Sequence, residues 1–172
     1  MVRNGEMLLV RRRNSHPPIK DMLHNKVREH GVSHGLAEVG YDIRLKQDIR
    51  FIGDTMPRLS ILQHGQSVPD LYYGRFVIAS AIEEFDMPND LMGIVHDKST
   101  WARKGLSVFN TVIEPGWKGF LTLELVYHGN DDLHIPAGSG IAQVIFHELA
   151  TPASYEGKYQ NQADQPVEAQ FT

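Results

Sequence analysis

The sequence has 172 residues, 41% of them apolar, and its 17 lysine and arginine residues against 21 aspartate and glutamate residues give a formal net charge of −4. These values predict one soluble globular domain, and they exclude a disordered chain, a membrane-spanning helix and non-specific binding to duplex nucleic acid. Because the chain contains no cysteine, disulfides, thiol nucleophiles and cysteine-containing zinc sites are excluded as well.

Residues 1–30 are mixed in composition. The apolar run at residues 7–10 is too short for a secretory leader and is followed by three arginines at 11–13, so we expect a cytoplasmic protein, in its own or a host's cytoplasm. After the break at Pro17-Pro18, the spacing of apolar residues over 19–23 permits one short helix.

From residue 40 onward, short apolar runs alternate with glycine and proline turn signals. This pattern predicts a mostly β fold, a sandwich or barrel of antiparallel strands with one or two short helices. The expected strands are 41–45, 49–52, 59–62, 75–79, 91–95, 106–109, 120–127, 133–135 and 141–146.

Residues 96–105 instead favour one or two helical turns, with a serine or aspartate cap and Gly105 as the stop. Lys98, Ser99, Thr100 and Arg103 place two cations and two hydroxyls at the expected helix start, where outward-pointing amides attract phosphate oxygens. A capped, solvated turn is the alternative. A P-loop is excluded because the glycine it needs before the lysine is absent and the chain is rich in strands.

Within the strand 120–127, alternation puts Thr122, Glu124 and Val126 on one face and the leucines on the other. With the leucines in the core, Glu124 points to solvent or into a cleft. A solvated strand glutamate is the simpler interpretation. In a partly desolvated cleft, however, its pKa suits a general base.

The C-terminal segment from residue 151 is rich in Gln, Ala, Gly and Pro, and it is expected to be mobile. Its aromatic and polar residues are either linker residues or parts of a lid that closes over a ligand. Residues 114–117 have the composition of a turn. The nine histidines lack ligand spacing, so no protein-held metal is expected.

Taken together, these segments resemble the dCTP deaminases, relatives of the trimeric dUTPases, over about residues 39–163. The matching segments occur in the family's order and spacing, so the set is more specific than any one of them. They are GYDIRL at 40–45, FVIA to MPND at 76–90, KSTWARKGL at 98–106, IEPGWKG at 113–119, LTLEL at 121–125, PAG to IAQ at 136–143 and GKYQNQ at 157–162.

The resemblance implies a single domain over residues 1–172, a homotrimer of distorted β-barrel (β-clip) subunits with active sites between them. Residues 1–38 would be a divergent N-terminal segment and 151–172 a mobile C-terminal lid. The reaction implied is zinc-independent hydrolytic deamination of dCTP, with Mg²⁺ accompanying the triphosphate.

The resemblance also implies roles for individual residues. Glu124 is the general acid and base and, with Ser99 and Arg103, belongs to the catalytic set. The implied substrate-binding residues are Lys98, Ser99, Thr100, Trp101, Ala102, Arg103, Asn110, Glu114, Thr122, Leu123, Gln143, Tyr155, Lys158 and Gln162.

One departure from the family pattern and two other classes of function leave alternatives open. The run Asn110-Thr111-Val112-Ile113-Glu114 differs where the family lines its base pocket, so a 5-substituted cytosine is an alternative base. A dUTPase or a bifunctional enzyme shares the fold, but dUTPases ordinarily carry an apolar residue at the position of Glu124. A non-catalytic nucleotide-binding regulator is the alternative outside enzymes.

Overall fold

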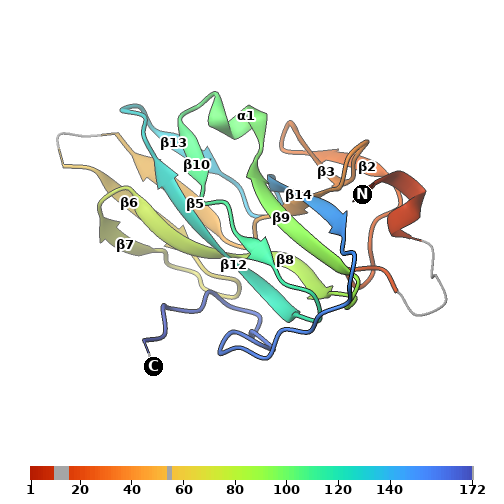
Figure 1. Cartoon of the computed structure of the whole chain (residues 1–172). Helices are drawn as coiled ribbons and strands as arrows, with labels where there is room; N and C mark the ends of the chain where they lie inside the picture. The colour runs from red at the N-terminus through yellow and green to blue at the C-terminus, as the bar shows by residue number, and fades with distance from the viewer. Residues whose placement is uncertain (10–15, 54–55, 172) are drawn as a thin grey trace.

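The computed structural model describes residues 1–9, 16–53 and 56–171, and it consists mainly of β-strands (Figure 1). The arginines at 11–13 lie outside the described residues. The elements are β1 (Val2–Arg3), η1 (Gly5–Leu8), β2 (Lys26–Glu29), β3 (Val32–Leu36), β4 (Tyr41–Arg44), β5 (Asp48–Ile52), β6 (Arg58–Leu62), β7 (Asp70–Tyr73), β8 (Phe76–Asp86), β9 (Leu91–Asp97), α1 (Ser99–Ala102), β10 (Leu106–Val108), β11 (Val112–Ile113), β12 (Lys118–Tyr127), β13 (Leu133–Ile135) and β14 (Gly140–Glu148).

The described strands form three antiparallel sheets. The largest has the order β11-β9-β14-β4-β3-β2, with β1 also paired to β14, and the others have the orders β10-β12-β8 and β13-β5-β6-β7. All nine predicted strands are present, and β8, β9, β12 and β14 are among those that extend beyond their expected bounds. The mostly β prediction is therefore confirmed.

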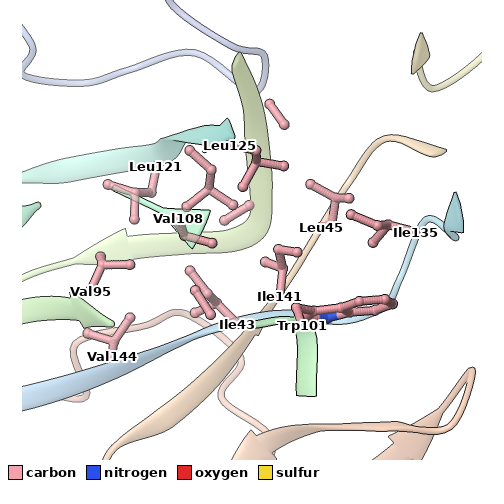
Figure 2. Packing of buried hydrophobic residues seen from close by; sticks show 14 of the residues in the cluster. Ile43, Leu45, Val95, Trp101, Val108, Leu121, Leu125, Ile135, Ile141 and Val144 are labelled. Carbon is pink, nitrogen blue, oxygen red and sulfur yellow. The ribbon is translucent and has the colours of Figure 1, made fainter. Parts of the chain in front are cut away.

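One core lies between the sheets. Figure 2 shows side chains from all three of them meeting there, together with Trp101 from α1. Ile43, Leu125 and Ile135, which represent the three sheets, have no exposed surface. Burial of this kind contributes roughly 25 cal/mol per Å² of apolar area removed from water.

The short helix expected over 19–23 is wrong. Ile19 forms an isolated antiparallel bridge to Phe85, and the turn that follows places Asp21 at φ 50°. Ile19 and Met22 are both buried. A turn can bury two apolar residues three positions apart as well as a helix can, so the spacing alone does not distinguish them. The described short helices are η1 and α1.

Candidate active site

A cleft of about 450 Å³ contains Glu124. Its walls come from β8, from the segment 111–117, from β12 and from the C-terminal segment, and they thus join parts of the chain far apart in sequence. The lining residues are Phe76, Ile78, Thr111, Val112, Ile113, Glu114, Trp117, Leu121, Thr122, Glu124, Tyr155, Tyr159, Gln162, Val167, Glu168 and Ala169.

Strand alternation on β12 aims Glu124 into this cleft. Leu121, Leu123 and Leu125 are buried in the core, so Thr122 and Glu124 lie on the opposite face, as the alternation predicts. Glu124 is half-buried, whereas Glu114 and Glu168 in the same lining are exposed. Burial withdraws the Glu124 carboxylate from water and raises its pKa, while a hydrogen bond from its own backbone acts in the opposite direction.

The neighbouring Thr122 is held by the C-terminal segment. Its hydroxyl donates to Gln162 Oε1 at 3.3 Å and accepts from the Val167 N–H at 3.0 Å. The face of β12 beside Glu124 is therefore covered by residues about 40 positions later in the sequence.

A glycine allows this segment to lie against β12. Gly119 has φ 128°, and a Cβ added to it would lie 2.5 Å from the Gln162 nitrogen and 2.6 Å from the Gln162 oxygen. The two backbones form a parallel bridge, and Phe120 N–H donates to the Gln162 carbonyl at 3.2 Å. Only a residue without a side chain fits at this contact.

Further hydrogen bonds fix the start of the segment. The Trp117 indole N–H donates to the Tyr159 carbonyl at 2.6 Å, and Tyr155 N–H donates to the Pro115 carbonyl at 2.8 Å. Gln160 accepts from Lys118 N–H and donates to the carbonyl of Gly116. The segment from residue 151 is thus docked on its own chain, and its mobility as a lid stays a prediction.

The segment predicted to bind phosphate is held differently from the sequence expectation. The expected serine or aspartate cap is wrong, because the N-cap residue is Lys98 and it makes no side-chain capping bond. β9 runs on to Asp97, whose carboxylate accepts the Val108 N–H at 2.7 Å. Gly105, with φ 86°, follows the helical turn as expected.

In α1 and the Arg103 that follows it, one side chain is buried and the others are exposed. Trp101 is 8% exposed, and its indole N–H donates to the Gly140 carbonyl at 2.7 Å, so it belongs to the core. Ser99, Thr100, Ala102 and Arg103 are exposed. The hydroxyls and the guanidinium expected to bind phosphate therefore face outward.

Lys98 does not share that exposure. Its ammonium lies 2.5 Å from Asp42 Oδ2, and the two side chains are 10% and 5% exposed. Asp42 also accepts a hydrogen bond from the Ser33 hydroxyl at 3.2 Å. The cation expected beside a triphosphate is thus engaged within its own chain.

Only part of the predicted set lies in the cleft. Glu114, Thr122, Glu124, Tyr155 and Gln162 line it. Those outside its lining are Lys98, Ser99, Thr100, Trp101, Ala102, Arg103, Asn110, Leu123, Gln143 and Lys158. In Figure 1, α1 and the C-terminal segment lie at opposite ends of the molecule.

Three of the outlying residues have contacts of their own. Leu123 is 1% exposed in the core, as its place in the alternation requires. Gln143 donates to the Val39 carbonyl at 2.8 Å, and Lys158 donates to the Gln170 carbonyl. Asn110 is exposed.

Sequence reasoning missed several members of the lining. Ile78 and Val167 contribute apolar walls. Trp117 is predicted only as part of a turn, although the indole of a buried tryptophan needs an acceptor, and that need signals an overlying segment. Ile78 and Val167 carry no local signal, because their role depends on the docked C-terminal segment. Tyr159, which adds an aromatic wall, is among the C-terminal residues predicted to be either linker or lid.

The described lining has a one-sided charge. It contains three carboxylates, Glu114, Glu124 and Glu168, and no lysine or arginine. Such a cleft suits an uncharged ring with polar edges and repels a polyphosphate.

Among residues 1–9, 16–53 and 56–171, no three or more histidine, aspartate or glutamate side chains cluster so as to hold a metal ion. No described helix has the length and apolar character needed to cross a membrane.

Comparison with known proteins places this geometry in context. Residues 15–149 match the family described as dCTP deaminase-like. A dCTP deaminase of Acidobacterium capsulatum is 30% identical over 161 residues, covering 84% of this chain and 86% of the relative. One from Roseiflexus castenholzii is 32% identical over 158 residues, with the same coverages, and one from Campylobacter curvus is 35% identical over 145 residues, covering 76% and 78%.

Solved structures support the fold. A Staphylococcus bacteriophage 80alpha dUTPase, in a mutant form with dUpNHpp, has a TM-score of 0.50 and 15% identity, covering 99% of this chain and 95% of its own. A mutant dUTPase from phage phi11 of S. aureus, described with a structural Mg(II) ion, has a TM-score of 0.50 and 14% identity, covering 92% and 95%. At these identities the likeness concerns the fold alone.

Proposed function

The chain belongs to the dCTP deaminase-like family, and we propose from this premise that it hydrolyses dCTP to dUTP and ammonia. The observation that carries the proposal is the half-buried Glu124, whose pKa is raised by burial and which points into a cleft that suits an uncharged ring. A carboxyl group in such a place can both take and return a proton near neutral pH.

In the proposed mechanism, the Glu124 carboxylate takes a proton from a water molecule held beside the ring. The hydroxide adds to C4 of cytosine, and the carboxyl group gives its proton to N3. A second proton passes from the added hydroxyl group through the carboxylate to the departing amine. The C4–N bond then breaks, leaving a C4 carbonyl and ammonia, and dCTP plus water becomes dUTP plus ammonia. Proton transfer by one carboxyl group contributes about 10²- to 10⁴-fold, and positioning of the water adds to this.

Other lining residues are proposed to hold the nucleoside. Thr122 lies beside Glu124 under the C-terminal segment, where its backbone and that of Leu123 border the ring. Glu114 faces the sugar or the base, and Tyr155 and Gln162 approach from the C-terminal segment. Asn110, Gln143 and Lys158 stay as predicted contacts.

The phosphates are proposed to bind the exposed Ser99, Thr100 and Arg103 of a neighbouring subunit. Two observations support a site shared between subunits. The described cleft lining has no lysine or arginine, and α1 lies on the opposite side of the molecule from the C-terminal segment that covers the cleft (Figure 1). A closed homotrimer brings α1 of each subunit to the cleft of the next. Ser99 and Arg103 then belong to the catalytic set with Glu124.

Magnesium is proposed to arrive with the triphosphate. Phosphate oxygens are hard ligands that suit Mg²⁺, and the bound ion would neutralise part of the phosphate charge. We place the reaction in a cytoplasm, in keeping with a chain that has no cysteine.

A product assay tests the function. The purified protein is incubated with Mg²⁺ and, separately, dCTP, 5-methyl-dCTP or dUTP, while nucleotide products, ammonia and pyrophosphate are measured. We expect ammonia and dUTP from dCTP. Turnover of 5-methyl-dCTP would show that the pocket around Val112 admits a 5-substituent.

Other products would redirect the assignment. Formation of dUMP from dCTP would indicate a bifunctional enzyme, and pyrophosphate from dUTP alone would indicate a dUTPase. No product from any nucleotide would favour a non-catalytic binding protein.

Mixed subunits test the shared site. Glu124→Gln and Arg103→Ala are each expected to be inactive, but after they are unfolded together in equal amounts and refolded, about one quarter of the sites regain both wild-type residues by random assortment. Activity should return to that fraction of the wild-type value. Each variant refolded alone is the control, and a mixture that stays inactive would place both residues in one chain's site.

A further inference from the structure

We propose that Asp42 and Lys98 are positioning residues that set the orientation of α1, and through it of Ser99 and Arg103. This inference rests on the function proposed above, because it assigns the part that aims the phosphate-binding groups. It differs from the sequence expectation that Lys98 itself binds phosphate.

The ion pair links three strands of the largest sheet. Lys98 follows the end of β9, and the neighbouring strands are β14 and then β4, which carries Asp42. The lysine side chain therefore reaches across β14. Since neighbouring strands lie about 4.8 Å apart, the contact spans the width of β14. It ties the segment after β9 to β4, in the interior of the sheet.

Asp42 is a rigid anchor for this contact. It is 3% exposed and is paired in register with Gly35 on β3 and with Gln143 on β14. The Ser33 hydroxyl donates to the same carboxylate oxygen that binds Lys98. With its backbone held from both sides, the carboxylate has little freedom to follow the lysine.

α1 cannot set its own direction. It has four residues and no side-chain bond at its N-cap, and so short a helix is not stable without tertiary contacts. The bond of Trp101 to the Gly140 carbonyl holds its far side, and the bond of Asp97 to Val108 N–H closes the loop around it. The Lys98 ion pair is the tether at its N-cap residue.

The burial of the pair argues for orientation rather than stability alone. Moving two charges out of water costs about as much as their attraction returns, and apolar residues of similar size often stabilise a fold equally well. A charge pair, however, fixes one geometry. Lys98 Nζ has a carboxylate partner and is largely covered, which leaves Ser99, Thr100 and Arg103 to meet the phosphates.

A double-mutant cycle separates positioning from direct phosphate contact. Lys98→Met, Asp42→Asn and the double variant are made in a Glu124→Gln background, so that dCTP binds without turnover, and Kd for dCTP with Mg²⁺ is measured by calorimetry. We expect each single variant to bind about tenfold more weakly, because it leaves a buried charge without its partner, and the double variant to return to within about threefold of its parent.

Direct phosphate contact gives a different pattern. If Lys98 binds phosphate, Asp42→Asn binds as its parent does, while Lys98→Met and the double variant are equally weak, and the inference is overturned. Lys104→Met removes an exposed lysine two residues after α1 and is the matched control, expected to bind normally. If a single variant fails to fold, the double variant decides alone. Binding within about threefold of its parent supports positioning, and binding weakened by more than about tenfold indicates direct phosphate contact.

Hydrogen–deuterium exchange supplies a readout that needs no nucleotide. The amides of Trp101, Ala102 and Arg103 are bonded to the carbonyls of Lys98 and Ser99, and they should exchange faster in both single variants while the amides of β12 stay protected. Unchanged exchange and unchanged binding in folded variants of lower Tm would show a purely structural pair. If the Glu124→Gln parent binds no dCTP, the proposed function is contradicted. If the single variants still show faster exchange in α1, the role of the ion pair in holding α1 is supported.

Discussion

Glu124→Gln is expected to lower kcat by about 10²- to 10⁴-fold, while Kd for dCTP and the fold are retained. Glutamine keeps the shape of the side chain and its contact with the ring, but its amide cannot accept a proton from water. The measurement is ammonia release under saturating dCTP, with Kd from calorimetry. A variant that turns over as fast as the parent would remove Glu124 from the mechanism.

Thermal unfolding of the same variant tests the electrostatics of the cleft. Burial raises the pKa of Glu124 in the folded state, so the folded protein binds more protons than the unfolded chain between the ordinary glutamate pKa and the raised one, and the carboxyl group's contribution to stability falls as pH rises through that window. Above it, the ionised carboxylate destabilises the fold. Glu124→Gln should therefore have the higher Tm at pH 7, and the difference should vanish below about pH 4, where both side chains are neutral.

Gly119→Ala is expected to displace the C-terminal segment and to lower kcat/KM by about 10²-fold. A Cβ at Gly119 would lie 2.5 Å from the backbone nitrogen of Gln162, and backbone cannot yield as the end of a flexible side chain can. Gln162 and Val167 would then leave Thr122. Limited proteolysis should show faster cleavage within residues 155–169, alongside the kinetic loss.

Gly74→Ala is the matched control for this prediction. Gly74 also has a positive φ, 114°, but a Cβ there would meet no atom within 4 Å. It shares the backbone strain of a side chain at positive φ, about 1–3 kcal/mol, without the collision. Equal losses in the two variants, or a Gly119→Ala protein with full activity, would show that docking of the segment on Gly119 does not serve the reaction.

The parts of the fold that alternate in hydrophobicity were predictable. β12 and β8 each bury one face, and both follow a period of two. β2 and β7 are exposed along their whole length, so neither face carries an apolar signal, and β1 and β11 have only two residues each. These four strands are defined by their hydrogen-bonded neighbours, which sequence alone does not reveal.

The candidate site was predictable in part. Glu124 could be found because it lies on the face opposite the leucines of an alternating strand, and the exposure of Ser99 and Arg103 follows from a turn between strands. The partner of Lys98 lies 56 positions away, at Asp42, and nothing local to either residue indicates the pair. The alternation also predicts that Leu123 is buried in the core, so its side chain cannot contact the cytosine ring.

The pairing of β8 with β12 contains an irregularity with a consequence for how such chains change length. Phe120 is opposite Glu84 and Thr122 is opposite Ser80, so three residues of β8 face the single Leu121, an excess of two. Because the excess is two residues, the alternation of buried and exposed side chains stays in phase. Each strand therefore keeps the same face toward the core before and after the irregularity. One residue inserted in β12 between this step and Glu124 would exchange the faces, turning the carboxylate inward and a leucine into the cleft. Two inserted residues would keep both faces in place, so the length of this strand can change by two without moving Glu124 out of the cleft.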